Sequence, residues 1–212
     1  MDETCSISGG AEVVLFDYGG VLSAEGWKKG LSLIARENGL DSDKFIRTAA
    51  DTVYETGYIL GEASQDDFWR ELKIRTGIRG DETSFADELM SHFVLDERMI
   101  DLARRLSAGG ITIGILSDQT DWLDQLDARD DFFKYFDHVF NSYHMGKGKR
   151  DATLFDDIAA KLKTKPQKIL FIDDDPGNVE RARQKGWQAC IYTVAEVDSF
   201  HEQMERAFGI RK

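Results

Sequence analysis

Acidic residues follow two apolar segments of the chain that have the composition of buried strands. Asp17 comes directly after "EVVLF", and the triple acid Asp173, Asp174 and Asp175 comes directly after "KILFI". In an open parallel sheet, ligands bind at the carboxyl ends of the strands, so these side chains are expected at one edge. Clustered carboxylates repel one another and need a cation to stay ionised. Their hard oxygen atoms predict a Mg²⁺ site.

A hydroxyl and two lysines are expected at the same edge. Ser117 follows the apolar segment "ITIGIL", and Lys147 and Lys149 lie in the glycine-spaced loop "SYHMGKGKRD". A metal ion, a lysine and a hydroxyl are groups that enzymes use together to bind and transfer a phosphoryl group. Each residue also has an ordinary interpretation: Asp17 as a turn residue, Ser117 as a helix cap, the basic loop as solvated surface. Three successive acids are harder to explain in this way, because a helix cap needs only one of them.

The elements that position these residues alternate between strands and helices. The apolar segments are nearly continuous, as expected of strands that are covered on both faces. Helical patterns intervene, notably over 151–163, with Asp151 placed to cap the start, and over 175–186, with Asp175 as cap. The alternation predicts an α/β fold with a Rossmann-like, doubly wound parallel sheet. The expected strands are residues 12–16, 111–116, 138–140, 168–172 and 188–192.

The segment 23–96 interrupts this alternation. It contains no convincing strand, only amphipathic patterns such as "WKKGLSLIARENGL", "SQDDFWRELKIRTG" and "SFADELMSHFVL". So much helical sequence is too long for a simple crossover between the first two strands. We therefore predict a core domain formed by residues 11–22 and 97–212, with residues 23–96 inserted as a helical cap domain.

The composition narrows the classes of partner. With 42% hydrophobic and 31% charged residues, the 212-residue chain has the balance of a globular protein with a sizeable core. The formal net charge of −12 disfavours nucleic acid and anionic membranes as partners. No apolar run approaches the length of about 18 residues that a membrane span needs. We expect a cytoplasmic monomer or homodimer that acts on a small molecule.

Four segments in order resemble the signature motifs of the haloacid dehalogenase (HAD) superfamily of phosphatases. They are "LFDYGGVL", "ILSDQT", "GKGKRDATLF" and "LFIDDDPGNVERARQKGW". The resemblance extends from residue 12 to about residue 208, and the helical insert matches the subgroup whose cap follows the first motif. Any one of these motifs is weak evidence for the family, but four of them in the right order form a specific pattern.

The resemblance assigns roles to these residues. It implies that Asp17 attacks phosphorus and forms an aspartyl-phosphate that water hydrolyses. It implies that Mg²⁺ is held by Asp17, the backbone carbonyl of Gly19 and Asp174, with Asp173 in support.

The remaining motif residues would bind the phosphate group. The resemblance implies that Ser117 donates a hydrogen bond to a phosphate oxygen and that Lys149 neutralises both nucleophile and phosphate. The backbone N–H groups of Asp118 and Gln119 would assist. Asn178 belongs to the fourth motif.

Gly19 departs from the family pattern. Most family phosphatases carry a second aspartate there, a general acid whose loss typically costs about 10²–10⁴ in rate. Glycine retains the carbonyl for the metal and favours substrates with good leaving groups, such as an anomeric or an acyl phosphate. Alternatively, Glu25 or His92 supplies the proton.

Two further departures concern the second and third motifs. Arg150 and Ala152 stand where two prolines are usual, so Arg150 is either a substrate contact or a surface arginine. Asp118 replaces a common asparagine and places a carboxylate beside the proposed phosphate site, which weakens the phosphatase interpretation unless Asp118 points away.

Two alternative functions remain open. A 2-haloacid dehalogenase would attack carbon and need no metal, but that subgroup shows "DAYGT" at the first motif and an arginine soon after it, whereas here the next arginine is Arg36. A non-catalytic protein that binds a phosphate ligand or a partner would not need the nucleophile, lysine and paired acids together. The sequence favours a Mg²⁺-dependent phosphatase of a small phosphorylated metabolite, such as a sugar phosphate.

Overall fold

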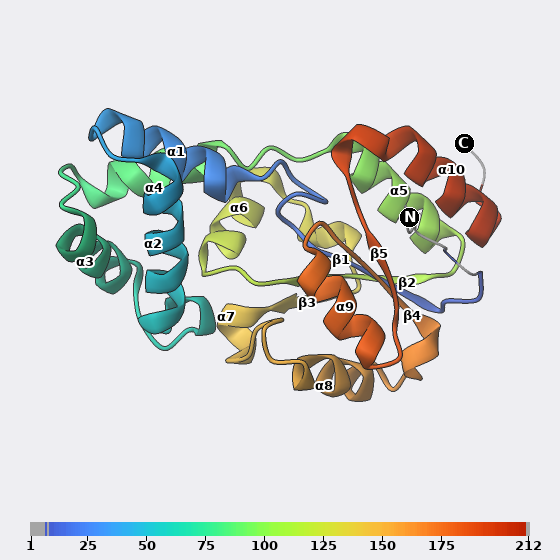
Figure 1. The fold of residues 1–212 in the computed structure, drawn as a ribbon. Helices are drawn as coiled ribbons and strands as arrows, with labels where there is room; N and C mark the ends of the chain where they lie inside the picture. The colour runs from blue at the N-terminus through green and yellow to red at the C-terminus, as the bar shows by residue number, and fades with distance from the viewer. Residues whose placement is uncertain (1–6, 8, 211–212) are drawn as a thin grey trace.

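One parallel sheet organises the molecule. The structure, a computed structural model, describes residues 7 and 9–210. In this part of the chain the strands follow the order β3-β2-β1-β4-β5, and all neighbours are parallel (Figure 1). Each strand lies within one residue of its predicted bounds, which confirms the doubly wound, Rossmann-like α/β fold. The strands are β1 Val13–Phe16, β2 Thr112–Ser117, β3 His138–Asn141, β4 Ile169–Asp173 and β5 Gln188–Ile191.

Helices cover both faces of the sheet. Side chains such as Val14 and Phe16 join one hydrophobic cluster with α5, α6 and α10, whereas Val13 and Leu15 join a second cluster with α8 and α9. Figure 1 shows α5 and α10 on the side opposite α8. Burial on both faces explains why the strands are nearly continuous apolar segments. These helices are α5 Glu97–Ala108, α6 Trp122–Asp130, α8 Thr153–Leu162, α9 Pro176–Gln184 and α10 Val197–Phe208.

Short helical turns complete the connections of the core. A four-residue helix follows β3, and single 3₁₀ turns precede β3, β4 and α10. Their bounds are α7 Ser142–Met145, η2 Phe133–Tyr135, η3 Pro166–Lys168 and η4 Val194–Glu196.

The two helix starts predicted in the core differ in outcome. Asp175 caps α9 by accepting the N–H of Asn178 at 3.0 Å, with Pro176 at the first helical position, as predicted. The prediction that Asp151 begins a helix is wrong, because α8 begins at Thr153 and has no side-chain cap. The Asp151 carboxylate accepts the N–H of Thr153 at 2.9 Å, which holds the turn before the helix instead.

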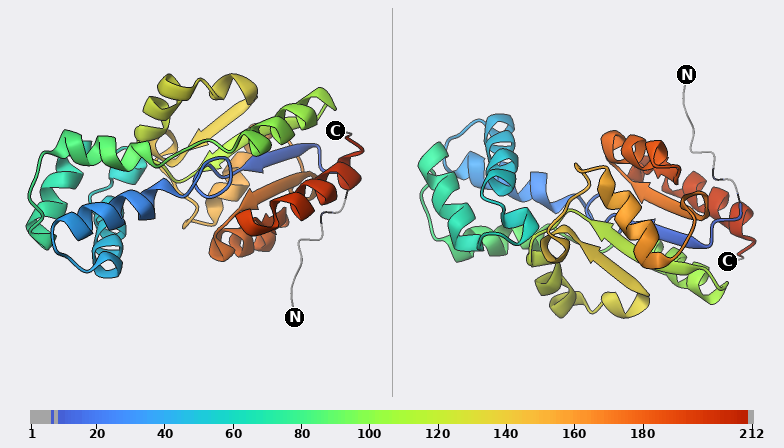
Figure 2. Two further views of the ribbon diagram at one scale, coloured as in Figure 1. Left: turned by 90° about the horizontal axis from the view of Figure 1, so that it is seen from above. Right: turned by 90° about the horizontal axis from the view of Figure 1, so that it is seen from below.

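Residues 23–96 contain helices alone, and these lie together at one end of the molecule (Figure 2). Helix α1 packs against α2 and α4. Three of the four α-helices correspond to the predicted amphipathic segments, but α2 was not among them. The elements are α1 Gly26–Glu37, α2 Ser42–Glu55, η1 Tyr58–Leu60, α3 Gln65–Thr76 and α4 Glu82–Ser91.

The two ends of the helical insert lie side by side, where the chain leaves the sheet region and returns to it. Ser23 and Leu95 form an antiparallel bridge, and the N–H of Ala24 donates to the carbonyl of Val94 at 2.9 Å. At a second contact, the Ser142 hydroxyl donates to the carbonyl of Ile59 in η1 at 2.8 Å. The helical insert is therefore held against the sheet region both at its two ends and through η1.

Among the residues that the structure describes, no helix combines the length and the apolar character that crossing a membrane requires.

Candidate active site

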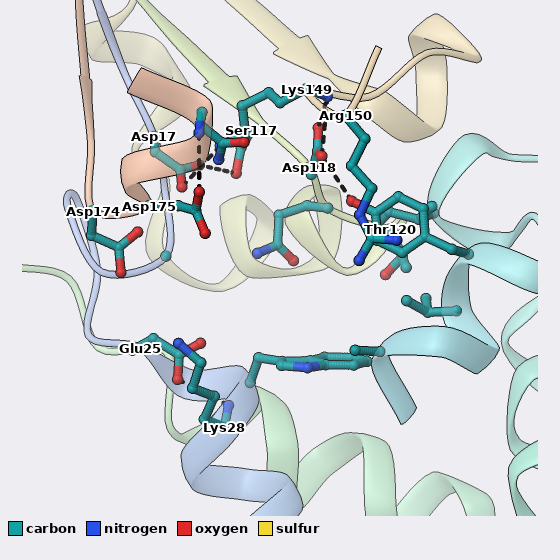
Figure 3. A pocket seen from close by; sticks show the side chains of 18 of the residues that line it. Asp17, Glu25, Lys28, Ser117, Asp118, Thr120, Lys149, Arg150, Asp174 and Asp175 are labelled. Carbon is teal, nitrogen blue, oxygen red and sulfur yellow. Dashed lines mark hydrogen bonds and ion pairs between the residues drawn. The ribbon is translucent and has the colours of Figure 1, made fainter. Parts of the chain in front are cut away.

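Three neighbouring strands bring the predicted side chains to one edge of the sheet. Asp17 directly follows β1, Ser117 is the last residue of β2, and Asp173 is the last residue of β4. Since β1 lies between β2 and β4, these side chains converge at the carboxyl end of the sheet, and Figure 3 shows Asp17 and Ser117 there. This is the place where open α/β sheets bind their ligands.

Asp17 is held on both carboxylate oxygens. Its Oδ1 accepts the hydroxyl of Ser117 at 2.6 Å and the N–H of Tyr18 at 2.7 Å, and its Oδ2 lies 3.0 Å from Nζ of Lys149. The side chain is 11% exposed, so it is accessible from one direction only. Burial raises the pKa of Asp17 to about 7, although Lys149 and Ser117 oppose the rise. A bound cation would favour the ionised form that a nucleophile needs.

Lys149 is a buried cation between two carboxylates. Its Nζ lies 2.7 Å from Oδ2 of Asp173 in addition to its contact with Asp17. Burial alone would lower the pKa of Lys149, but Asp17 and Asp173 outweigh it and raise that pKa above its usual range. Lys149 therefore stays charged. Its loop is fixed on both sides, because Asp118 accepts its N–H at 2.8 Å and Arg181 donates to its carbonyl at 2.8 Å.

Asp173 is fully buried and organises its neighbours. It accepts the side-chain amide of Asn178 at 3.0 Å and the N–H of Asp175 at 2.7 Å. Together with the Lys149 ammonium, these donors satisfy both of its oxygens. Asp173 therefore fixes the lysine and the start of α9 in one arrangement.

The acids also form a candidate metal site. One carboxylate oxygen from each of Asp17, Asp173 and Asp174 lies within 4.8 Å of the other two. Burial and the charge of Asp173 raise the pKa of Asp174, as expected of acids that lack a counter-cation. Gly20 makes room for them: its φ is +80°, and a Cβ there would lie 2.6 Å from Cγ of Asp174. This cradle of hard oxygen donors fits Mg²⁺.

A cavity of about 450 Å³ opens over these residues, between the sheet edge and the helical insert (Figure 3). Its volume suits a small metabolite. The core supplies the acids, Ser117 and Lys149. The insert supplies a wall with both apolar and polar side chains, namely Glu25, Trp27, Lys28, Ala50, Val53, Tyr54, Ile59 and Phe93.

The two residues expected to replace the missing acid at Gly19 are separated by the structure. Glu25 lines the cavity, and burial raises its pKa against the opposing effect of Lys28. His92 is not among the lining residues, and its Nε2 lies 2.8 Å from Oε1 of Glu88. Of the two, only Glu25 is placed to exchange a proton with a molecule in the cavity.

Asp118 has a structural partner on each oxygen. Besides the N–H of Lys149, it accepts the hydroxyl of Tyr54 at 2.9 Å. Its carboxylate thus joins the third-motif loop to helix α2 of the insert. Both oxygens of Asp118 are therefore engaged by protein donors, although the residue still lines the cavity.

Two residues that surround the site were not among the sequence candidates. Arg181 anchors Lys149 and donates to Oδ1 of Asn178 at 2.5 Å. The signal for Arg181 is its position three residues after Asn178, which places both on one face of α9. Tyr54 lies in helix α2, and no local sequence signal indicates its contact with Asp118.

A family model for haloacid dehalogenase-like hydrolases matches residues 11–186. The chain therefore belongs to the haloacid dehalogenase-like hydrolase family, which confirms the resemblance read from its motifs.

Two curated relatives match shorter stretches. Bifunctional epoxide hydrolase 2 of Rattus norvegicus is 26% identical over 122 residues, which are 54% of this chain and 21% of that protein. Enolase-phosphatase E1 of Yersinia pestis (strain Pestoides F) is 35% identical over 77 residues, which are 35% of this chain and 31% of that protein. The matches thus span about a fifth and about a third of these relatives' own lengths.

Solved structures share the fold over most of the chain. The HAD family enzyme bt-2542 of Bacteroides thetaiotaomicron, in complex with magnesium and inorganic phosphate, has a TM-score of 0.68 at 20% identity and covers 87% of this chain and 94% of its own. L-2-haloacid dehalogenase from Xanthobacter autotrophicus, with chloropropionic acid covalently bound, has a TM-score of 0.62 at 16% identity and covers 84% and 76%. At these identities the likeness concerns the fold.

Proposed function

We propose that this hydrolase is a Mg²⁺-dependent phosphatase of a small phosphorylated metabolite, with Asp17 as its nucleophile. One observation carries the proposal: Asp17 lies between the Ser117 hydroxyl and the Lys149 ammonium, beside two further carboxylates. In this position, the Lys149 ammonium can offset the negative charge of an approaching phosphate group. The Ser117 hydroxyl can donate a hydrogen bond that orients that group.

The reaction would proceed in two displacements. An oxygen of Asp17 forms a bond to phosphorus while the ester P–O bond breaks, and the departing oxygen leaves with its electron pair and takes up a proton. Water then attacks the aspartyl-phosphate, which releases inorganic phosphate and restores the Asp17 carboxylate. Ser117 and the backbone N–H groups of Asp118 and Gln119 would hold the phosphate oxygens, and Lys149 would neutralise them.

The metal would be held by Asp17, Asp174 and the carbonyl of Gly19, with Asp173 in support. When bound there, Mg²⁺ supplies positive charge that lets an anionic carboxylate and an anionic phosphate share one site. This set of ligands is supported by the short separation of the Asp17, Asp173 and Asp174 carboxylates, which lie within 4.8 Å of one another, and by Gly20, which keeps the space beside Asp174 open.

The substrate would be a phosphate whose leaving group needs little protonation, such as an anomeric sugar phosphate or an acyl phosphate. This follows from Gly19, which offers no acid, although Glu25 is within the same cavity. We further propose that residues 23–96 act as a cap domain, because their helices line the cavity that the core leaves open.

Two comparisons support phosphate chemistry. The Bacteroides enzyme of this fold binds magnesium and inorganic phosphate. The Yersinia relative is an enolase-phosphatase. The Xanthobacter structure, in contrast, is a dehalogenase with the same fold.

The test is hydrolysis of p-nitrophenyl phosphate and acetyl phosphate with Mg²⁺ and with EDTA. Both leaving groups are good, so the missing acid does not hide activity. The wild type is compared with Asp17→Asn and with Asp51→Asn, which makes the same change at an exposed acid on α2 outside the cavity. We expect metal-dependent turnover in the wild type and in Asp51→Asn, and none in Asp17→Asn.

Other outcomes favour the alternatives. If folded wild type turns over neither ester, the phosphatase proposal fails. Chloride release from 2-chloropropionate that EDTA does not affect would then indicate a dehalogenase. Phosphate binding without any turnover would indicate a non-catalytic binding protein.

A further inference from the structure

Of the four cations that line the cavity, Lys149 and Arg181 have a partner for the charged group, whereas Lys28 forms no ion pair among the described residues but lies near the acids. Lys149 is paired with Asp17 and Asp173, and Arg181 is bound to the carbonyl of Lys149 and to Asn178. Lys28 lies close enough to Glu25 and Asp174 for its charge to act on their pKa values. These three cations therefore belong to the end of the cavity where the acids lie.

Arg150 differs from the other cations. Its guanidinium stacks on the ring of Tyr54, with Cζ 3.5 Å from the ring centroid. Among the described residues, no carboxylate forms an ion pair with it and no acceptor takes a hydrogen bond from it. The stacking fixes the plane of the guanidinium while its N–H edges stay free. In Figure 3 Arg150 lies on the opposite side of the cavity from Asp174.

Tyr54, on whose ring Arg150 stacks, is itself held in place by a hydrogen bond. The Tyr54 hydroxyl donates to Asp118 at 2.9 Å, and Asp118 accepts the N–H of Lys149 at 2.8 Å. Both carboxylate oxygens of Asp118 are thus engaged by donors other than Arg150. Arg150 is an exposed side chain that lines the cavity, and the planar fork of a guanidinium without an acidic partner matches a carboxylate or a phosphate.

Part of the cavity wall is apolar. Trp27, Val53, Ile59 and Trp122 are among the lining residues, and they suit a carbon skeleton rather than a further charge. The cavity thus offers a cationic, metal-binding end and a separate arginine.

We propose that Arg150 binds a second anionic group of the substrate, so that the substrate class is phosphate monoesters that also carry a carboxylate or a second phosphate. This inference rests on the proposed phosphatase function and names the substrate class of that site.

The test compares esters that differ only in the second anion. The probes are p-carboxyphenyl phosphate, its neutral analogue p-carbamoylphenyl phosphate, and p-phenylene bisphosphate, so that a carboxylate and a phosphate are tested separately. The measured quantity is kcat/KM for each anionic ester divided by that for the neutral one. The variants are Arg150→Gln, and Arg47→Gln as a control at an exposed arginine of α2 outside the cavity.

We expect the wild type and Arg47→Gln to prefer at least one anionic ester by about tenfold or more, as a charged hydrogen-bond pair provides. Arg150→Gln should lose that preference. An equal fall for all three esters would show that Arg150 contacts the transferred phosphate, and an unchanged ratio would show that it only stacks. Either result would overturn the inference.

Failure of the proposed function is distinguishable. If wild type hydrolyses no ester, the phosphatase proposal fails, and the same ratio is then taken from dissociation constants measured by calorimetry. Tighter binding of an anionic probe that Arg150→Gln abolishes would still support the anion site. Equal binding of all three probes would overturn it.

Discussion

Placing an aspartate at position 19 should give the protein turnover of phosphate esters with poor leaving groups. Gly19 lines the cavity next to Asp17, where most phosphatases of the family have a general acid. Such proton transfer is typically worth about 10²–10⁴ in rate. We expect Gly19→Asp to raise kcat/KM for ethyl phosphate by about 10²-fold, the low end of this range because no residue has been selected to orient the new acid.

The structure has room for this side chain. A Cβ at Gly19 would lie 3.6 Å from Cε1 of Phe93 and 3.7 Å from Nε2 of Gln119, which are ordinary van der Waals distances. Gly19 also has no positive φ, so an L-residue fits its backbone. Replacing a compatible glycine stabilises by about 0.4–1 kcal/mol, and repulsion from Asp17 and Asp174 offsets part of this gain. We therefore expect the free energy of unfolding to change by less than about 1 kcal/mol.

The assay compares two leaving groups in three proteins. The value of kcat/KM is measured with ethyl phosphate and with p-nitrophenyl phosphate for wild type, Gly19→Asp and Gly19→Asn. A hundredfold gain corresponds to about 2.7 kcal/mol of transition-state stabilisation. It should appear with ethyl phosphate and not with the nitrophenyl ester, whose leaving group needs no proton. The asparagine variant has the same size but no acidic proton, so it should show no gain.

The neighbouring glycine provides a contrast. Gly20 has a φ of +80°, and a Cβ there would collide with Asp174, so Gly20→Ala should lower both activity and stability. The reasoning would be refuted if Gly19→Asp accelerated both esters equally, if Gly19→Asn matched it, or if Gly19→Asp unfolded as Gly20→Ala does.

Three further predictions concern protonation, metal and docking of the insert. Burial and Arg105 lower the pKa of His201, so its stabilisation is complete above the ordinary pKa of 6.5 and is lost as the pH falls through the lower folded value. Urea unfolding at several pH values should therefore show a smaller acid loss of stability in His201→Gln, and an identical loss would contradict this cause. Adding Mg²⁺ to EDTA-treated protein should raise the Tm by mass action, whereas Asp174→Asn should show little shift; equal shifts would place the metal elsewhere. Tyr58→Phe removes the hydroxyl that donates to Asp121 and should lower the free energy of unfolding by about 1 kcal/mol, so an unchanged urea midpoint would argue against this contact.

The sequence predicts the core well because its signals are local. A continuous apolar strand followed by an acid identifies Asp17 and Asp173, and the rule that parallel strands meet at one edge brings them together with Ser117. Lys149 required the resemblance, because nothing in its own loop indicates that the side chain is buried between two acids. Four motifs in order supplied that information.

The contacts between insert and core could not be predicted in the same way. Helix α2 has an apolar face formed by Phe45, Ala49 and Val53, but its Tyr54 contacts Asp118, which is 64 residues further along the chain. Such pairs depend on how the insert packs on the core, which the spacing of residues in the sequence does not predict. The environment of Arg150 could not be predicted either, because its stacking on Tyr54 is another contact between core and insert. This contact bears on whether Arg150 is a surface arginine or a substrate contact.

The junction at Ser23 and Leu95 has an evolutionary consequence. Because the insert departs and returns at a bridged pair of residues, its two ends are neighbours in space. The insert therefore occupies one position in the connection between β1 and β2, as a short turn would. The pairing of Val13 with Thr112 does not depend on the length or shape of the insert. We propose that changes within residues 23–96 can alter the wall of the cavity while the strand ends that carry Asp17, Ser117 and Asp173 keep their places.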